Sequence, residues 1–246
     1  MTDKALGLPA HTLIELFESG DVEVEGRMPY SSNTTLLVNV SGCDDDGNKI
    51  EHRAIYKPGR GERPLRDFPP GLYKREVAMY RLAKALDFDV IPPTAIGLGP
   101  FGEGSFQAFV EADFAQHYFT LREAGIGTHD LMQLCLVDLI ANNTDRKSGH
   151  CLLGRDGRVY GIDHGLAFHA QWKLRTVLWD FVGLPIPPAD LAKVNAFVAA
   201  GAPAEICALL DTFEIDAMMT RAAAVLDEGV FPFDDTDGHR WPWPLV

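Results

Sequence analysis

The sequence contains little cysteine and no apolar stretch that approaches the length needed to cross a membrane. Its cysteines lie far apart, without a Cys-x-x-Cys pair, in a chain too long to need disulfide bonds for stability. The opening residues MTDKALG place Lys4 beside Asp3, where a signal peptide has a basic start. We therefore expect a cytoplasmic protein without a membrane span, with free thiols at Cys43, Cys135, Cys151 and Cys207.

Positive charge is also scarce. The 246 residues include 22 lysines and arginines against 35 aspartates and glutamates, which gives a formal net charge of −13. Such a surface repels nucleic-acid phosphates and anionic lipid headgroups, so we expect neither nucleic acid nor an acidic membrane as the partner. Hydrophobic residues make up 46% of the chain, which is typical of a globular protein with a sizeable core.

The sequence has no internal repeat, and its hydrophobic periodicity changes along the chain. The first part alternates with a period of two, which is typical of strands, and contains helical segments at 11–18 and 72–86. The predicted strands are DVEVEG, TTLLVNV, KIEHRAIYK, residues 94–98 and residues 105–110.

The second part is mainly helical with one embedded hairpin. From Thr128, apolar residues recur at i, i+3, i+4, i+7 and i+8, which predicts a helix with one buried face. The short strands CLL and RVYGID are joined by GRDG, a hairpin turn signal. We therefore predict an α+β fold with a sheet-rich lobe over residues 1–110 and a helical lobe over residues 111–246.

Two charged residues of the first lobe form a candidate pair. Helical projection of residues 72–86 places Glu76 within the apolar stripe, and a buried carboxylate needs a partner. Lys57, at the end of the strand HRAIYK, meets that need. Two alternatives stay open: Lys57 is a solvated charge that blunts a sheet edge, or the helix is rotated so that Glu76 lies at a solvated margin.

Three aspartates and two histidines gather in the stretch NNTDRKSGHCLLGRDGRVYGIDHG, residues 142–165. A hairpin returns the chain to its starting point, so Asp145, His150 and Asp163 are expected to converge despite their separation. Two carboxylates and an imidazole can hold a divalent cation and accept a proton. The alternative is that Asp145 caps a turn, His150 is a satisfied strand residue and Asp163 begins a tight turn.

Taken in order, these residues are a strand lysine, a helix glutamate, a loop aspartate and an Asp-x-Gly after a hairpin, which is the set needed for phosphoryl transfer. NTDRKSGH followed by GIDHG resembles the catalytic and metal-binding segments of the phosphatidylinositol 3-/4-kinase-like superfamily of atypical kinases, which includes bacterial toxin-type serine kinases. The resemblance extends over roughly residues 22–168 and implies a two-lobed protein-kinase-like fold that binds ATP between its lobes.

The resemblance also implies a role for each matched residue. Lys57 would contact the ATP phosphates and Glu76 would hold Lys57. Asp145 would orient or deprotonate the acceptor hydroxyl. Asp163 and His150 would bind the metal ion, Mg²⁺ or Mn²⁺. His150 departs from the commoner asparagine at its position, and an imidazole nitrogen suits Mn²⁺ better than Mg²⁺.

The remaining nucleotide contacts follow from the same resemblance. The loop GRMPYSSNTT has a single glycine, so its phosphate contacts would come from Ser31, Ser32 and Asn33. The adenine would lie against the backbone of Phe109, Val110 and Glu111. An ordinary polar hairpin loop explains the first segment equally well.

The sequence therefore favours an ATP-dependent phosphotransferase that acts on a protein serine or threonine or on a small molecule. The first alternative is a nucleotide-binding pseudokinase that works through partner contacts. Transfer of a nucleotide instead of a phosphoryl group is a second. A metal-dependent hydrolase built on His150, Asp163 and His164 is a third.

Overall fold

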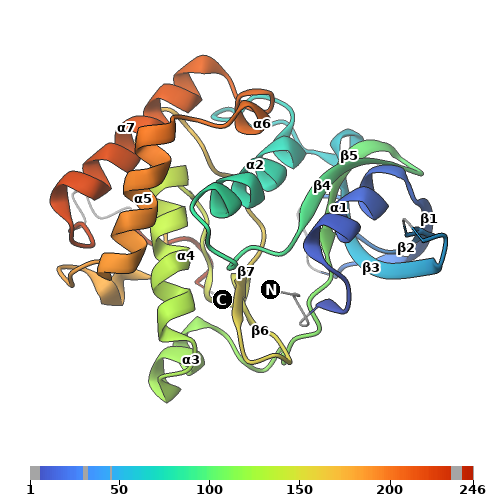
Figure 1. Ribbon diagram of the computed structural model, residues 1–246, viewed down its shortest axis with the longest axis horizontal. Coiled ribbons are helices and arrows are strands. Elements are labelled where there is room, and N and C mark those ends of the chain that lie inside the picture. Colours follow the sequence, from blue (N-terminus) through green and yellow to red (C-terminus); the bar gives the residue numbers. More distant parts are fainter. Residues whose placement is uncertain (1–5, 30–32, 45, 234–239, 246) are drawn as a thin grey trace. The chain divides into compact units, whose positions relative to one another are not determined.

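The computed structural model describes residues 6–29, 33–44, 46–233 and 240–245 (Figure 1). The chain forms two compact units. The first unit contains residues 1–77 and 92–111, and the second contains residues 78–91 and 112–246. The predicted α+β class is confirmed.

The first unit is built on a five-stranded antiparallel sheet in the order β1-β2-β3-β5-β4. The predicted strands and the helix at 11–18 are confirmed to within a few residues. The elements are α1 (Ala10–Ser19), β1 (Asp21–Arg27), β2 (Leu36–Cys43), β3 (Lys49–Pro58), β4 (Thr94–Gly99) and β5 (Gly102–Ala108).

Aromatic stacking fills the core of the first unit. Tyr56 of β3 lies opposite Phe106 of β5, and their rings stack with centroids 4.4 Å apart. Phe17 of α1 adds a third ring, 6.5 Å from that of Phe106. The helix lies close to β4, because a Cβ atom on Gly97 would be only 2.1 Å from the carbonyl oxygen of Phe17. A glycine in a strand interior often marks such a close backbone approach.

Helix α2 (Leu72–Ala85) begins in the first unit, and its residues from Ala78 onward belong to the second. Its N-terminal backbone N–H groups are capped by a distant residue. The Glu62 carboxylate accepts hydrogen bonds from the N–H groups of Gly71 at 2.8 Å and Tyr73 at 2.7 Å. An anionic acceptor here satisfies exposed donors and complements the helix dipole.

The second unit is mainly helical and contains the predicted hairpin (Figure 1). The strands β6 and β7 pair antiparallel, and α7 packs against both α4 and α5. The elements are α3 (Tyr118–Ala124), α4 (Thr128–Ala141), β6 (Cys151–Leu153), β7 (Val159–Gly161), α5 (Pro188–Ala200), α6 (Ala204–Cys207) and α7 (Thr212–Glu228), with short 3₁₀ turns at Ser148–His150 and Trp179–Phe181.

The prediction that the helix from Thr128 has one buried face is wrong. All residues of α4 from Gln133 to Ala141 are buried, and both α7 and β7 pack against the helix. A helix that is buried all round belongs to the centre of a unit. The interior of the second unit therefore includes a charged residue, Asp138.

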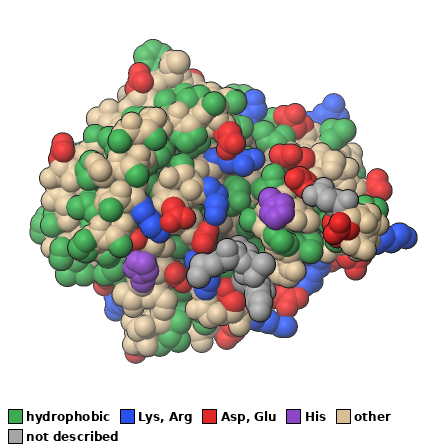
Figure 2. Space-filling view, in the orientation of Figure 1, with side chains coloured by type: hydrophobic (Ala, Val, Ile, Leu, Met, Phe, Trp, Pro, Cys, Tyr) green, Lys and Arg blue, Asp and Glu red, His purple; other side chains and the backbone are tan. Residues whose placement is uncertain are grey.

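The surface carries both signs of charge. On the face shown in Figure 2, acidic and basic side chains are interspersed. Among the residues that the structure describes, no helix is long and apolar enough to cross a bilayer.

The close approach of α1 to β4 gives a stability prediction. We expect Gly97→Ala to lower the free energy of unfolding by about 1–3 kcal/mol, because the new methyl group overlaps the Phe17 carbonyl and the Phe106 ring. Gly26→Ala is the matched control, since Gly26 also lies in a strand and its Cβ would have no neighbour within 4 Å. Denaturant unfolding measures both, and equal stabilities of the two variants would contradict the close packing at Gly97.

Candidate active site

The loop that follows α4 is shaped by Asn142. This residue ends the helix in the left-handed conformation, with φ 54°, which asparagine tolerates better than most residues. Its side-chain amide donates to the carbonyl oxygens of His169 at 2.8 Å and Gln171 at 2.7 Å, and its oxygen accepts from the N–H of Lys173 at 2.9 Å. Asn142 thus ties the start of the loop to the segment that follows the Asp-x-Gly.

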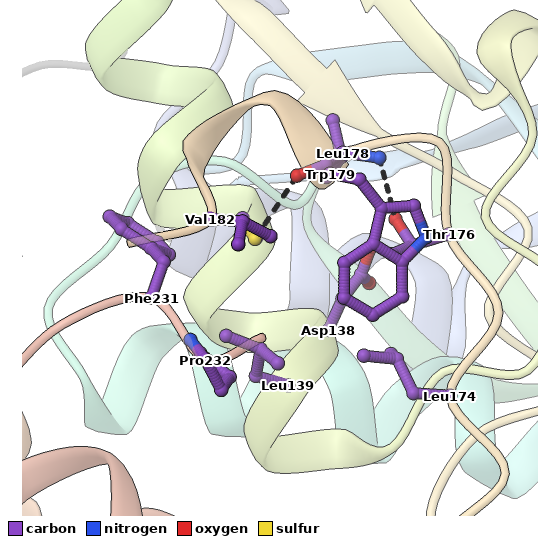
Figure 3. Close-up of a pocket in the computed structure, with 10 residues that line it drawn as sticks. Asp138, Leu139, Leu174, Thr176, Leu178, Trp179, Val182, Phe231 and Pro232 are labelled. Atoms are coloured by element: carbon purple, nitrogen blue, oxygen red, sulfur yellow. Dashed lines mark hydrogen bonds between the residues drawn. The ribbon is translucent and has the colours of Figure 1, made fainter. Parts of the chain in front are cut away.

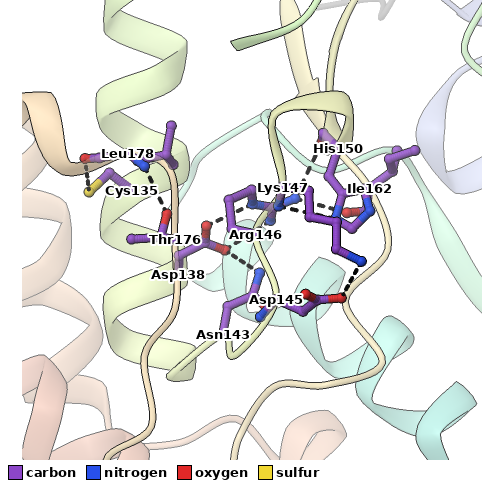
Figure 4. Close-up of polar contacts among 10 residues, drawn as sticks. All are labelled: Cys135, Asp138, Asn143, Asp145, Arg146, Lys147, His150, Ile162, Thr176 and Leu178. Carbon is purple, nitrogen blue, oxygen red and sulfur yellow. Dashed lines mark hydrogen bonds and ion pairs between the residues drawn. The ribbon is translucent and has the colours of Figure 1, made fainter. Parts of the chain in front are cut away.

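A buried ion pair joins this loop to helix α4 (Figure 4). The fully buried Arg146 guanidinium donates from Nε to Asp138 Oδ2 at 2.7 Å and from Nη2 to Oδ1 at 2.8 Å. Such a two-point contact fixes the orientation of the guanidinium as well as its position. Burial opposes the charge of Arg146, but attraction to Asp138 outweighs it and raises the pKa of Arg146.

Arg146 also holds both ends of the hairpin. Its Nη1 atom donates to the carbonyl oxygen of His150 at 3.3 Å and to that of Ile162 at 2.8 Å. Ile162 directly precedes Asp163, and the Ile162 N–H donates to the His150 carbonyl at 3.0 Å. Arg146, which follows Asp145 in the sequence, therefore bonds both to His150 and to the residue before Asp163.

Asp145 is held at the turn of the loop. Its N–H donates to Asn143 Oδ1 at 3.1 Å, and Asn143 in turn donates to Asp138 at 2.8 Å. The Asp145 carboxylate pairs with Lys147 Nζ at 3.0 Å. Burial raises the pKa of Asp145, Lys147 opposes the rise, and the charge of Asp163 adds to it. A carboxylate in this setting is a stronger base than an exposed one.

The predicted convergence on the hairpin is confirmed for His150 and Asp163, whose Nε2 and Oδ2 atoms are 3.5 Å apart. Asp163 adopts a left-handed backbone, with φ 60°, and 53% of its side chain is exposed. The charge of Asp163 also contributes to the raised pKa of Asp145. His164, in contrast, is fully buried.

The donor set fits a metal ion that arrives with a nucleotide. Among the described residues, no group of three or more histidine, cysteine or acidic side chains forms a metal cage. Mg²⁺ in phosphotransferases is commonly held by one or two carboxylates together with substrate phosphates and water. His150 Nε2 and the exposed carboxylate of Asp163 would supply the protein ligands.

The tautomer of His150 affects this assignment. Its Nδ1 atom accepts a weak 3.4 Å hydrogen bond from the Lys147 N–H, so in the neutral ring Nε2 carries the proton and faces Asp163. Metal binding through Nε2 requires the other tautomer and gives up this contact. Without that change, His150 can donate to Asp163 and orient it.

In the first unit, the predicted ion pair of Lys57 and Glu76 is present. Glu76 is buried, with 4% of its side chain exposed, whereas Lys57 keeps 22%. The alternative in which Glu76 lies at a solvated helix margin is therefore wrong, because the carboxylate points into the unit toward β3.

The other predicted nucleotide contacts have mixed outcomes. Ser31 and Ser32 lie outside the described residues. Asn33 Oδ1 accepts from the N–H of Arg63 at 3.0 Å, so this oxygen serves the loop after β3. The Phe109 N–H donates to the Arg53 carbonyl at 3.0 Å, so this one donor of the predicted adenine edge is already used.

Sequence reasoning missed Asp138, Arg146 and the two asparagines at the start of the loop, Asn142 and Asn143. One signal was available. Asp138 lies between Leu134, Cys135 and Ala141 at helical spacing, so it occupies the apolar stripe of its helix as Glu76 does. Its partner could not be found in this way, because Arg146 lies in an irregular loop without periodicity.

Comparison with known proteins agrees with the fold. The structure of hydra Fam20 with sugar matches with a TM-score of 0.59 at 12% identity and covers 89% of this chain and 87% of that one. The Helicobacter pylori proinflammatory kinase CtkA has a TM-score of 0.47 at 9% identity and covers 87% and 94%. The likeness to the Fam20 chain shows that this protein has an atypical kinase-like fold.

The sequence is also similar to that of a mycobacterial protein. It is 36% identical over 263 residues to Protein Rv2133c of Mycobacterium tuberculosis, with 92% of each chain covered. The chain therefore belongs to the family of that protein. No protein-family model matches the sequence.

The buried pair gives a prediction for stability. We expect Arg146→Met to lower the free energy of unfolding by about 3–5 kcal/mol, because it leaves the Asp138 charge buried without its partner. Adding Asp138→Leu should restore part of the loss, since an apolar pair can replace a buried ion pair.

Arg122→Met is the matched control, because the Arg122–Asp180 pair is exposed and should change stability little. Denaturant unfolding compares the variants. An Arg146→Met protein as stable as Arg122→Met would contradict the role given to the buried pair.

Proposed function

We propose that the protein is an ATP-dependent phosphotransferase that passes the γ-phosphoryl group to a hydroxyl of a protein serine or threonine or of a small molecule. It would be an atypical kinase of the phosphatidylinositol 3-/4-kinase-like type. The observation that carries the proposal is the pairing of Lys57 with the buried Glu76. In kinases, a strand lysine held by a helix glutamate contacts the nucleotide phosphates.

The loop residues support the acceptor side of the reaction. Phosphoryl transfer has a loose transition state, so the protein mainly positions the two reactants and stabilises charge. Asp145, whose pKa is raised by burial, would orient the acceptor hydroxyl and take its proton. Asp163 and His150 would hold a divalent ion, which supplies positive charge beside the phosphates.

The acceptor class follows from the net charge of the protein. The net charge of −13 disfavours an acidic lipid surface, so a protein or metabolite hydroxyl fits better. The backbone of Val110 and Glu111 would bind the adenine, since the N–H of Phe109 is already used.

Transfer of label from γ-labelled ATP, with Mg²⁺ and with Mn²⁺, tests the proposal. Label on the protein itself or on added protein acceptors, or hydrolysis that depends on Asp145, supports it. Nucleotide binding without transfer or hydrolysis favours a pseudokinase, for which the His150 departure is the specific support. Label from α-labelled ATP instead indicates nucleotide transfer.

Asp145→Asn separates chemistry from binding. The change keeps the shape of the side chain but removes its charge. We expect phosphoryl transfer to fall by about 10²-fold or more, within the range usual for loss of a general base, while the ATP dissociation constant changes little. Asp156→Asn is the matched control, because Asp156 lies in the turn of the hairpin and contacts Arg158 and Tyr160.

Three measurements on Asp145→Asn distinguish the accounts: label transfer, ATP affinity and melting temperature. If Asp145 only holds the turn, stability and ATP affinity should fall together. A folded, ATP-binding variant with undiminished transfer would show that Asp145 has no part in the chemistry.

His150→Asn tests the metal site. We expect the native protein to work better with Mn²⁺ than with Mg²⁺, and the variant to reverse this preference, because an amide oxygen is the harder ligand. Mn²⁺ affinity, measured by electron paramagnetic resonance with a non-hydrolysable ATP analogue, gives a readout independent of turnover. Unchanged affinity and preference would exclude His150 as a ligand and leave it as a donor to Asp163.

A further inference from the structure

The C-terminal segment, residues 240–245, lies against the candidate active site of the second unit. We name it the C-terminal strap. Two backbone carbonyls anchor it at three points. The Arg240 carbonyl accepts from the Thr176 N–H at 3.0 Å and from the Trp179 indole N–H at 3.1 Å. The Leu245 carbonyl accepts from the N–H of Ser148 at 2.8 Å, within the loop between Asp145 and His150.

Residues 175–177, which the strap contacts, are themselves hydrogen-bonded to the loop. The Arg146 N–H donates to the Arg175 carbonyl at 3.0 Å, and the Arg146 carbonyl accepts from Val177 at 3.1 Å, as in a short parallel ladder. The Arg175 N–H donates to Asn143 at 3.0 Å. The strap therefore reaches the loop directly through Ser148 and indirectly through residues 175–177.

A small cavity is lined by Thr176 and Trp179 of this segment together with Asp138 and Leu139 of α4 (Figure 3). Side chains that line a void lose contacts on that side.

The composition of the strap favours a fixed course. Its sequence RWPWPL has a proline at every second position after Trp241, and proline restricts its own backbone and that of the residue before it. Pro242 is buried, whereas 88% of Trp243 is exposed. The anchoring contacts are thus made by backbone carbonyls, and the exposed indole of Trp243 is not needed for them.

From these contacts we propose that the C-terminal strap is a positioning element of the catalytic loop, which keeps Asp145 and His150 in the geometry for phosphoryl transfer. Its catalytic consequence rests on the proposed function, but its effect on the loop does not. Small displacements of a catalytic group can cost about 10²-fold in rate, so a six-residue segment outside the site can control turnover.

Two shortened proteins test the proposal. Of the three anchors, a chain that ends at residue 244 loses the Leu245 contact with Ser148, and a chain that ends at residue 239 loses all three. Hydrogen exchange of the amides of residues 143–150 is measured first, because it needs neither nucleotide nor acceptor. We expect faster exchange in the first variant at Ser148 and in the second across the loop.

Label transfer from γ-labelled ATP is measured on the same proteins. We expect kcat to fall several-fold in the chain ending at 244 and about 10- to 100-fold in the chain ending at 239, with the ATP dissociation constant nearly unchanged. A strap with only a structural role would lower the melting temperature without this selective loss of kcat. Trp243→Ala is the control, because it alters the strap without removing an anchor, and its exchange and transfer should match the native protein.

The possible results are distinct. Unchanged exchange of the loop in both shortened chains overturns the proposal, and so does an increase in transfer, which would make the strap inhibitory. If the longer deletion unfolds the protein, the chain ending at 244 decides alone. If the native protein transfers no label, the proposed function fails, while the exchange data still decide whether the strap positions the loop.

Discussion

The ion pair of Arg146 and Asp138 is the interaction on which the geometry of the candidate site depends. A fully buried arginine is costly to desolvate, and here four side-chain hydrogen bonds compensate that cost. Two go to Asp138 in α4 and two go to the backbone at the ends of the hairpin. Asp145 directly precedes Arg146, and Asp163 directly follows Ile162, which Arg146 contacts. The positions of both aspartates therefore depend on the bond between Arg146 and helix α4.

The first unit uses a buried carboxylate differently. Glu76 is as buried as Asp138, but its partner Lys57 remains partly exposed. A lysine ammonium is a compact charge on a flexible stem, whereas the guanidinium of Arg146 is held in a fixed plane. The first pair can therefore adjust to a ligand, and the second cannot without loss of its hydrogen bonds. This contrast matches a binding role for Lys57 and a scaffolding role for Arg146.

Periodicity predicted the regular elements and one of the two buried carboxylates discussed above, Glu76. Glu76 could be found because α2 has a regular projection, and the hairpin could be found because GRDG separates two short apolar strands. Irregular backbone carried no such signal. The hydrogen bonds of Asn142, the use of the Phe109 N–H by Arg53 and the contact of Leu245 with Ser148 join residues that no local pattern connects. The burial of α4 on all sides did have a signal in its own sequence, because residues 134–141 are apolar except for Asp138.

Charge balance at the site bears on how an acidic protein could bind ATP. In the second unit, the cations Arg146 and Lys147 each have a carboxylate partner, namely Asp138 and Asp145. These pairs carry no surplus positive charge, and Asp163 adds a negative one. Under the proposed function, a nucleotide would therefore find no surplus positive charge among these residues of the second unit unless a divalent ion accompanies it. The same carboxylates that fix the geometry would then make nucleotide affinity depend on the metal, and Asp163, which is half exposed beside His150, would be the residue to receive that ion.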